Sequence, residues 1–152
     1  MILPIVAYGD PVLRKECKEI DADYPNLKEL ISNMKETMYN ASGVGLAAPQ
    51  IGKAIRLFLV DASPFAEDED LVNRVFINAE IIEEEGEEWA FNEGCLSIPD
   101  VRQDVFRQPK VTIEYQDENF ITHTETLDGL AARVFQHEYD HIEGVLFTEQ
   151  IK

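Results

Sequence analysis

Residues 129–142 place the strongest restriction on how this chain can fold. The first half of the segment, from Leu130 to Phe135, is apolar around most of a helical circumference. This pattern predicts a helix buried against a sheet on more than one side, because a surface helix keeps its apolar side chains on one stripe. Asp128 is placed to cap the start of this helix, and Gly144 lies just past its end.

The rest of the chain predicts one further helix and a set of strands. The helix is expected at about 24–41, with Gly43 ending it. Apolar residues recur there at helical spacing: Leu27, Leu30, Ile31, Met34 and Met38. Apolar or alternating stretches predict strands at 55–61, 75–82, 88–91, 111–115 and 120–127.

Turns and loops separate these elements. Gly86 marks a turn, residues 117–119 a hairpin, and residues 63–70 a solvated loop. Helices at both ends of mostly antiparallel strands predict an α+β fold, packed around the buried central helix. The length of 152 residues fits one compact domain.

The chain is strongly acidic, since 30 Asp and Glu against 13 Lys and Arg give a net charge of −17. An acidic surface repels phosphate backbones and anionic lipids, so we expect no direct binding to nucleic acid or membranes. The sequence has no apolar run of membrane-spanning length and no signal-peptide pattern at its start, which predicts a cytoplasmic location. In that compartment Cys17 and Cys95 are not expected to pair, which favours a metal or catalytic role for at least one of them.

The buried helix carries the sequence His-Glu-Tyr-Asp-His at residues 137–141. Residues four apart lie on one face of a helix, so both imidazoles can reach a common metal ion, with Glu138 beside them to act on a water molecule. The alternative is two surface histidines on a charged face. Burying these four polar side chains is costly without a metal or full pairing, so the pattern favours a metal-dependent hydrolase. His123 stands alone on a predicted strand and is not expected to be a ligand.

A catalytic metal needs a third protein ligand. Downstream of the helix, Glu143 and Glu149 are the acidic candidates. The better candidate is Cys95, between Gly94 and Pro99 at the end of a strand, where a tight turn can present a thiolate. A lone cysteine in such a place is more often a small buried apolar residue, so its position alone does not decide.

A third segment, Gly-Val-Gly-Leu-Ala-Ala-Pro-Gln at residues 43–50, allows close approach of the backbone. Gln50 offers an amide that can donate to a developing oxyanion. Taken alone, a helix end followed by a turn of small residues explains this segment equally well.

Together, three segments resemble the signature motifs of peptide deformylases. They are residues 43–50, Glu-Gly-Cys-Leu-Ser at 93–97, and Gln-His-Glu-Tyr-Asp-His at 136–141. The opening, with Pro-Ile-Val at 4–6 and Gly-Asp-Pro-Val-Leu-Arg at 9–14, is also similar to the start of that family. The resemblance covers essentially the whole chain and implies an enzyme that removes the formyl group from the N-terminal formyl-methionine of new proteins, releasing formate.

The resemblance also implies the parts of the mechanism. The metal ligands would be Cys95, His137 and His141, with a water molecule in the fourth position. That water would attack the formyl carbon, and Glu138 would take its proton and pass it to the leaving amine. Gln50 and the backbone N–H of Leu96 would hold the oxyanion. Ligand types alone favour Zn²⁺, whereas the resemblance implies Fe²⁺ in the cell, with Ni²⁺ or Co²⁺ as working substitutes.

Substrate binding is expected to be a strand addition, with N-formylmethionyl peptides pairing with two backbone segments. The resemblance places an apolar pocket for the methionine side chain beside them. The residues expected to contact the substrate are Val44, Gly45, Glu93, Gly94, Arg102, Leu130, Arg133 and Val134.

Relatives often carry a further C-terminal helix or strand, and this chain is expected to lack a long extension of that kind and to act as a monomer. Two other readings stay open. A metallopeptidase would use the same helix on an internal peptide bond, with a downstream third ligand and Cys95 serving only for packing. A non-catalytic peptide-binding module would have a closed metal shell and no turnover, and the presence of Glu138 and Gln50 argues against it.

Overall fold

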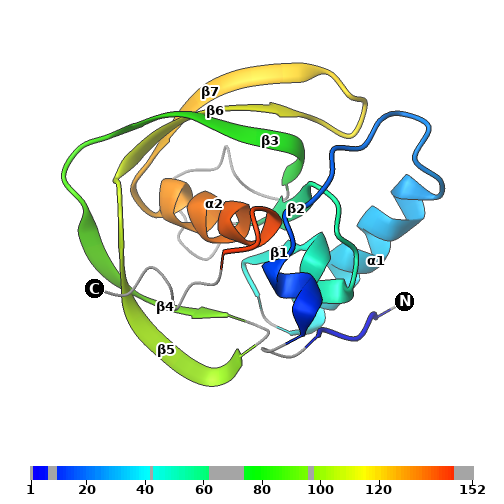
Figure 1. Ribbon diagram of the computed structural model, residues 1–152, viewed down its shortest axis with the longest axis horizontal. Helices are drawn as coiled ribbons and strands as arrows, with labels where there is room; N and C mark the ends of the chain where they lie inside the picture. The colour runs from blue at the N-terminus through cyan, green and yellow to red at the C-terminus, as the bar shows by residue number, and fades with distance from the viewer. Residues whose placement is uncertain (1, 7–9, 42, 62–73, 96–97, 146–152) are drawn as a thin grey trace.

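Residues 2–6, 10–41, 43–61, 74–95 and 98–145 are described by the computed structural model, with the backbone alone for 91–95, 98–104 and 130. Figure 1 shows the arrangement of the elements. In chain order they are η1 (Pro11–Arg14), α1 (Leu27–Asn40), β1 (Gly45–Ala47), η2 (Ala48–Ile51), β2 (Leu57–Val60), β3 (Arg74–Glu85), β4 (Trp89–Cys95), β5 (Ile98–Arg107), β6 (Lys110–Gln116), β7 (Thr122–Asp128) and α2 (Gly129–Ile142).

The described strands form two separate antiparallel sheets. One has five strands in the order β1-β2-β3-β6-β7, and the other is the β4–β5 hairpin. In Figure 1 helix α2 lies between them, with β3, β6 and β7 along one side and β4 and β5 along the other. Two helices with antiparallel sheet confirm the predicted α+β class.

Helix α2 is enclosed over most of its length. Every residue from Ala131 to Glu138 is buried, and the helix contacts β1, β2, β6 and β7 of the larger sheet. The apolar first half therefore has the surroundings that its pattern predicts. No helix in the described part of the chain is long and apolar enough to cross a membrane.

Strand β2 is buried on both faces, which explains its unbroken apolar sequence. Phe58 and Val60 pack into a cluster with α2 residues, whereas Leu57 and Leu59 pack into a second cluster with α1 residues. Successive side chains of a strand point to opposite faces, so one strand serves both clusters. Of the apolar α1 residues, Ile31, Met34 and Met38 are buried in the second cluster, and Leu27 and Leu30 cover its rim.

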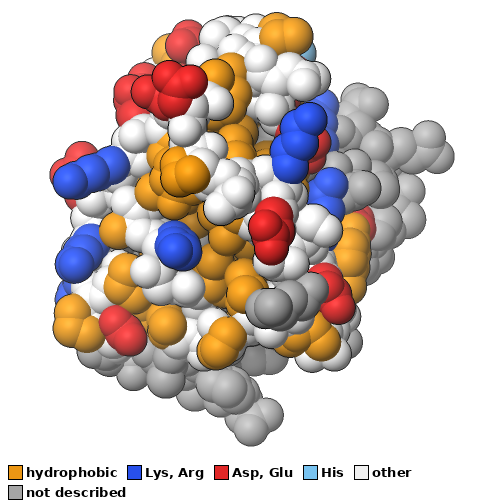
Figure 2. Space-filling model, turned by 90° about the vertical axis from the view of Figure 1, so that its right-hand side faces the viewer, with side chains coloured by type: hydrophobic (Ala, Val, Ile, Leu, Met, Phe, Trp, Pro, Cys, Tyr) orange, Lys and Arg blue, Asp and Glu red, His pale blue; other side chains and the backbone are white. Residues whose placement is uncertain are grey.

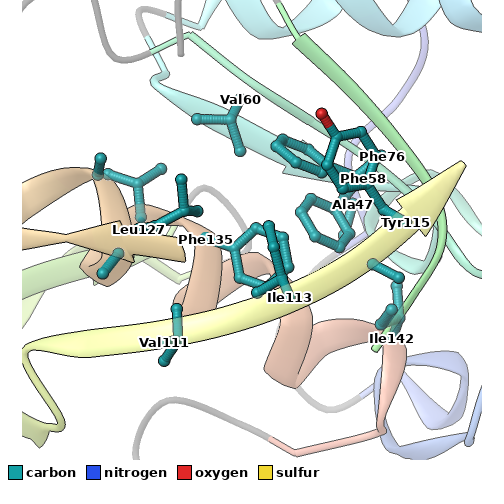
Figure 3. Packing of buried hydrophobic residues seen from close by; sticks show 14 of the residues in the cluster. Ala47, Phe58, Val60, Phe76, Val111, Ile113, Tyr115, Leu127, Phe135 and Ile142 are labelled. Atoms are coloured by element: carbon teal, nitrogen blue, oxygen red, sulfur yellow. The ribbon is translucent and has the colours of Figure 1, made fainter. Parts of the chain in front are cut away.

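Three phenylalanine rings form the centre of the first cluster (Figure 3). The ring centroids of Phe58 and Phe76 are 5.1 Å apart, and Phe135 of α2 lies 5.2 Å from Phe58 and 5.1 Å from Phe76. All three side chains are fully buried. Because Phe135 precedes the histidine-bearing turns by two residues, this packing fixes how α2 is rotated against the sheet.

The rim of the second cluster reaches the surface on the α1 side of the molecule. Figure 2 shows this face, where apolar side chains run between charged ones. The partly buried residues packed against the second cluster include Leu3, Ile20, Leu27, Leu30 and Phe120.

Strand β3 is longer than predicted because it pairs with two strands, β2 near its start and β6 further along. Its first residues pair with β2 and the rest pair with β6, with a register shift after Ile77. Asn78 sits at the shift with a φ of 53°. Its side-chain amide donates to the backbone carbonyl oxygen of Ile20 at 2.7 Å and to the side-chain Oε1 of Gln116 at 2.8 Å, and its own oxygen accepts from the N–H of Ile20. These bonds stabilise a backbone conformation that asparagine tolerates better than most residues.

Two strands were not predicted. Strand β1 has three small or apolar residues, all buried, and is too short to show alternation. Strand β5 belongs to the two-stranded sheet, and its charged residues and Pro99 hide the pattern.

The remaining predictions hold with shifted boundaries. The loop predicted at 63–70 lies outside the described residues. Gly86 and Gly144 occupy the predicted turn and helix end, both with positive φ. Asp128 occupies the predicted N-cap position of α2, but its side chain makes no capping hydrogen bond. Strand β7 runs directly through Asp128, and Gly129, with a φ of 59°, turns the chain into α2.

Replacing Phe58 by alanine should lower the free energy of unfolding by about 3–5 kcal/mol, because it removes a fully buried ring and its contacts with two others. Urea unfolding would measure the change. The matched control is Ile82→Ala on β3, whose side chain is 56% exposed, with an expected change within about 0.5 kcal/mol. Equal effects of the two substitutions would contradict this account of the core.

Candidate metal centre and active site

His137 and His141 lie on successive turns of α2 and face the same side. Their ring centroids are 5.2 Å apart with an interplanar angle of 72°. Their exposed fractions are 9% and 2%, so both imidazoles are held inside the molecule. The spacing of four residues therefore produces the juxtaposition that one shared metal ion requires.

The surroundings keep His141 neutral. Burial lowers its pKa well below the usual value, and positive charge on His137 and Arg107 lowers it further. A neutral imidazole is the form that binds a metal, whereas an imidazolium has no lone pair to offer. The two buried side chains fit a divalent metal by geometry, and His141 also by its protonation state.

Cys95, the expected third ligand, is the last residue of β4. It pairs with Ile98 across a register shift, so it lies where the hairpin turns. The side chain of Cys95 and the whole of Leu96 lie outside the described residues. Among the side chains that are described, no group of three His, Cys, Asp or Glu residues could hold a metal ion. Two nitrogen ligands and a cysteine would leave the fourth position of a tetrahedral site open.

The remaining cysteine, the third histidine and the two acidic candidates have different surroundings. Cys17 is a free, buried thiol, and burial raises its pKa to about 11. His123 is exposed, and its Nε2 lies 2.8 Å from Asp117 Oδ2. Glu143 accepts a hydrogen bond of 3.1 Å from Arg56. Glu149 lies outside the described residues.

Glu138 is 4% exposed and packs against the backbone of Gly45 on β1. A Cβ atom at position 45 would lie 2.5 Å from Oε2 of Glu138 and 2.8 Å from its Cδ and Cγ. Such distances are well inside van der Waals contact. Only glycine therefore allows this carboxyl group its position between α2 and β1, a constraint that the sequence alone did not reveal.

Gln50 lies in η2 and is 1% exposed. Its Oε1 accepts a hydrogen bond of 3.0 Å from the N–H of Ala47. This bond orients the amide and leaves Nε2 as its donor end. The carbonyl oxygen of Gln50 also accepts a 2.7 Å bond from the N–H of Val6, which ties the N-terminal segment to η2.

The residues predicted to contact a substrate lie on three strands, just before the first of them, and on α2. Val44 packs against the cluster that contains Val134, and Gly45 begins β1. Glu93 and Gly94 lie on β4, where Gly94 pairs with Arg102 across the hairpin. The side chains of Glu93, Arg102 and Leu130 lie outside the described residues.

Arg133 makes contacts that were not predicted for it. Its side chain is 2% exposed, and its guanidinium donates to the carbonyl oxygens of Val105 and Trp89, at 2.8 and 2.5 Å. The guanidinium carbon lies 4.5 Å from the centroid of the Trp89 ring. A charge on a buried helix needs such partners, so Arg133 connects α2 to the hairpin.

Two further connections of α2 were missed, one to Arg107 at the end of β5 and one to Gln108, the residue after it. Gln136 donates to the carbonyl oxygen of Gln108 at 2.8 Å, and Arg107 donates to Asp140 at 2.7 Å. The signal for them was present in the sequence, since polar residues on a helix predicted to be buried must have partners. What the sequence could not give was their identity.

Comparisons with known proteins identify the family. Residues 2–152 match the sequence model of the family described as polypeptide deformylase. The peptide deformylases of Christiangramia forsetii and Flavobacterium johnsoniae are each 66% identical over 161 residues, which cover 99% of this chain and 82% of each relative. The crystal structure of peptide deformylase from Thermotoga maritima has a TM-score of 0.91 at 41% identity, covering 100% of this chain and 99% of that one.

These matches confirm the resemblance seen in the three motifs. A family match over nearly the whole chain agrees with curated relatives at high identity and with a solved structure of the same fold. The chain therefore belongs to the peptide deformylases, a family of metal-dependent hydrolases that remove the N-formyl group from nascent peptides.

Proposed function

We propose that this chain removes the formyl group from the N-terminal formyl-methionine of newly made proteins, using one divalent metal held by Cys95, His137 and His141. The observation that carries the proposal is the pair of buried imidazoles on successive turns of α2, together with the buried carboxyl group of Glu138, the residue after His137, which lies against Gly45. We place this activity in the cytoplasm, where nascent chains emerge, and in a monomer.

Fe²⁺ is the metal we propose for the cell, with Ni²⁺, Co²⁺ or Zn²⁺ able to occupy the same ligands in purified protein. A cysteine and two histidines suit several of these ions. When bound, the metal supplies a Lewis acid that polarises the formyl oxygen and makes a water molecule easier to deprotonate.

Glu138 moves the protons. Glu138 directly follows His137 on α2, and its carboxyl group is buried against Gly45. In this proposal it accepts a proton from the attacking water and passes it to the leaving amine nitrogen. Gln50 Nε2 and the N–H of Leu96 donate to the oxyanion, which stabilises the transition state by about 3 kcal/mol for each donor. The bond from Ala47 to Gln50 Oε1 supports this role, because it orients the amide before the substrate arrives.

The substrate binds by adding a strand. In the described topology β1 is an edge strand of the larger sheet, and β4 has only β5 as a partner. The segments at Val44–Gly45 and Glu93–Gly94 thus lie on strands that can each accept an extended peptide backbone on one side. Val44, Leu130 and Val134 line the pocket for the methionine side chain, and Arg102 lies near its mouth. Arg133 is the neighbour of Val134 in this wall, and its guanidinium is engaged by the hairpin.

The function can be tested with a formate-release assay on formyl-Met-Ala, using protein loaded with Fe²⁺ under nitrogen or with Ni²⁺. The formyl peptide should be cleaved with a much higher kcat/KM than acetyl-Met-Ala, because the site closes around the small formyl hydrogen, where a methyl group would clash. Comparable kcat/KM values for the two peptides would contradict the proposal. Cleavage of an internal peptide bond would instead support a metallopeptidase.

Glu138→Ala should keep its metal and lose turnover by a factor of about 10²–10⁴, the usual contribution of a general acid–base. The physical reason is that Glu138 lies beside the ligands and not among them. Metal content by atomic spectroscopy and kcat by formate release would be measured on the same sample. Loss of metal in proportion to activity would assign Glu138 a different role.

Gly45→Ala should reduce kcat by at least about tenfold, because the added methyl group displaces the Glu138 carboxyl group. The control is the same substitution in a Glu138→Ala background, where the obstructing atoms are gone and the extra loss should be less than about twofold. Additive effects in the two backgrounds would show that Gly45 acts in some other way, such as through peptide pairing alone.

A further inference from the structure

The β4–β5 hairpin is a separate two-stranded sheet, although it carries the proposed third metal ligand at its turn. A two-stranded ribbon is only marginally stable by itself, and no other strand in the described part of the chain pairs with this one. Cys95 can meet His137 and His141 only if the hairpin is held in one position against α2. The side chains that hold it there therefore bear on the metal centre.

Arg133 is placed to hold both strands of the hairpin at once. Nη2 donates to the carbonyl oxygen of Trp89 on β4, and Nη1 donates to that of Val105 on β5. The guanidinium also stacks on the Trp89 ring, 4.5 Å from its centroid. A planar fork with several donors can make these contacts together, whereas a lysine ammonium cannot reproduce their geometry.

The other connections lie on the same stripe of α2. Gln136 reaches the carbonyl oxygen of Gln108, and Asp140 accepts from Arg107, the last residue of β5. Positions 133, 136 and 140 are three and four apart and so follow one face of the helix. Each of the histidines at 137 and 141 directly follows a member of this stripe. The face that holds the hairpin is therefore the immediate neighbour of the face that holds the imidazoles.

The base and the tip of the hairpin lie far apart along β4. Trp89 is the first residue of β4 and Cys95 is the last. At about 3.3 Å per residue they are roughly 20 Å apart along the strand. The guanidinium thus holds the hairpin at its base, and the cysteine would be held at its tip by the metal.

We propose that Arg133 is a positioning residue for the metal centre: by fixing the base of the hairpin to α2, it presents Cys95 to the two histidines before the metal arrives. The inference rests on the metal site proposed above. Without this attachment the hairpin samples several positions, and metal binding has to select the one in which all three ligands meet. Loss of the attachment therefore weakens metal binding and leaves the set of ligands unchanged.

The test measures metal affinity directly. Metal-free protein would be titrated with Co²⁺ against a competing chelator, while the thiolate-to-cobalt absorption band reports on the Cys95 bond. Arg133→Met should raise the Co²⁺ dissociation constant by ~10–100-fold, the usual effect of losing a group that orients a ligand. Arg133→Lys should fall between wild type and Arg133→Met. It also serves as the deciding variant if circular dichroism shows that Arg133→Met does not fold.

The chain offers a matched control in Arg56→Met. Arg56 is 7% exposed, donates to the carbonyl oxygen of Ala79 at 2.6 Å, and lies 5.7 Å over the Tyr139 ring, so these contacts lie away from the described part of the hairpin. Its removal should lower the free energy of unfolding and change the Co²⁺ dissociation constant of folded protein by less than about threefold. An equal loss of affinity in the arginine 133 and arginine 56 variants, or wild-type affinity in both arginine 133 variants, would overturn the proposal.

Cys95→Ser separates this inference from the proposed function. If that substitution leaves both Co²⁺ affinity and the absorption band unchanged, Cys95 is not a ligand and the proposed metal site fails. If it removes the band while the arginine 133 variants bind Co²⁺ like wild type, the metal site stands and only the positioning role of Arg133 is wrong.

Discussion

The structure depends on burying a helix that carries polar side chains. Between Ala131 and Glu138 every residue of α2 is buried, yet Arg133, Gln136, His137 and Glu138 are among them. Removing such groups from water is costly unless each finds a partner. The elements around α2 therefore provide polar contacts as well as apolar ones. Carbonyl oxygens of the hairpin accept hydrogen bonds from Arg133, and that of Gln108, just after β5, accepts one from Gln136. Gly45 leaves space for the side chain of Glu138.

The two sheets are attached to this helix by different forces. The larger sheet meets α2 through an apolar cluster centred on Phe58, Phe76 and Phe135. Apolar burial stabilises strongly but has little directionality. The hairpin is attached through hydrogen bonds and an ion pair, which weaken steeply when their geometry changes. A chemical site between the sheets needs both, because the core provides stability and the polar contacts fix where the hairpin stands.

Local features of the sequence predicted much of the fold and part of the candidate site. Helix α2, the spacing of its histidines and the antiparallel strands all follow from periodicity within a few residues of chain. Contacts between distant segments could not be read in the same way. Nothing near Gly45 indicates that a carboxyl group 93 positions later would lie on its Cα. Arg133 appeared out of place in an apolar wall because its partners, Trp89 and Val105, come from a hairpin of which only the first strand was foreseen.

Contacts with distant segments also explain why strand β1 is short and begins with a glycine. It is an edge strand of the described sheet, and an exposed edge offers unpaired backbone groups to any extended chain. Under the proposed function that edge receives the substrate peptide. A side chain on Gly45 would push away the Glu138 carboxyl group. One glycine thus meets two demands, since it offers backbone for pairing and lets the proton-transferring group approach that backbone closely. A residue with any Cβ could meet only the first.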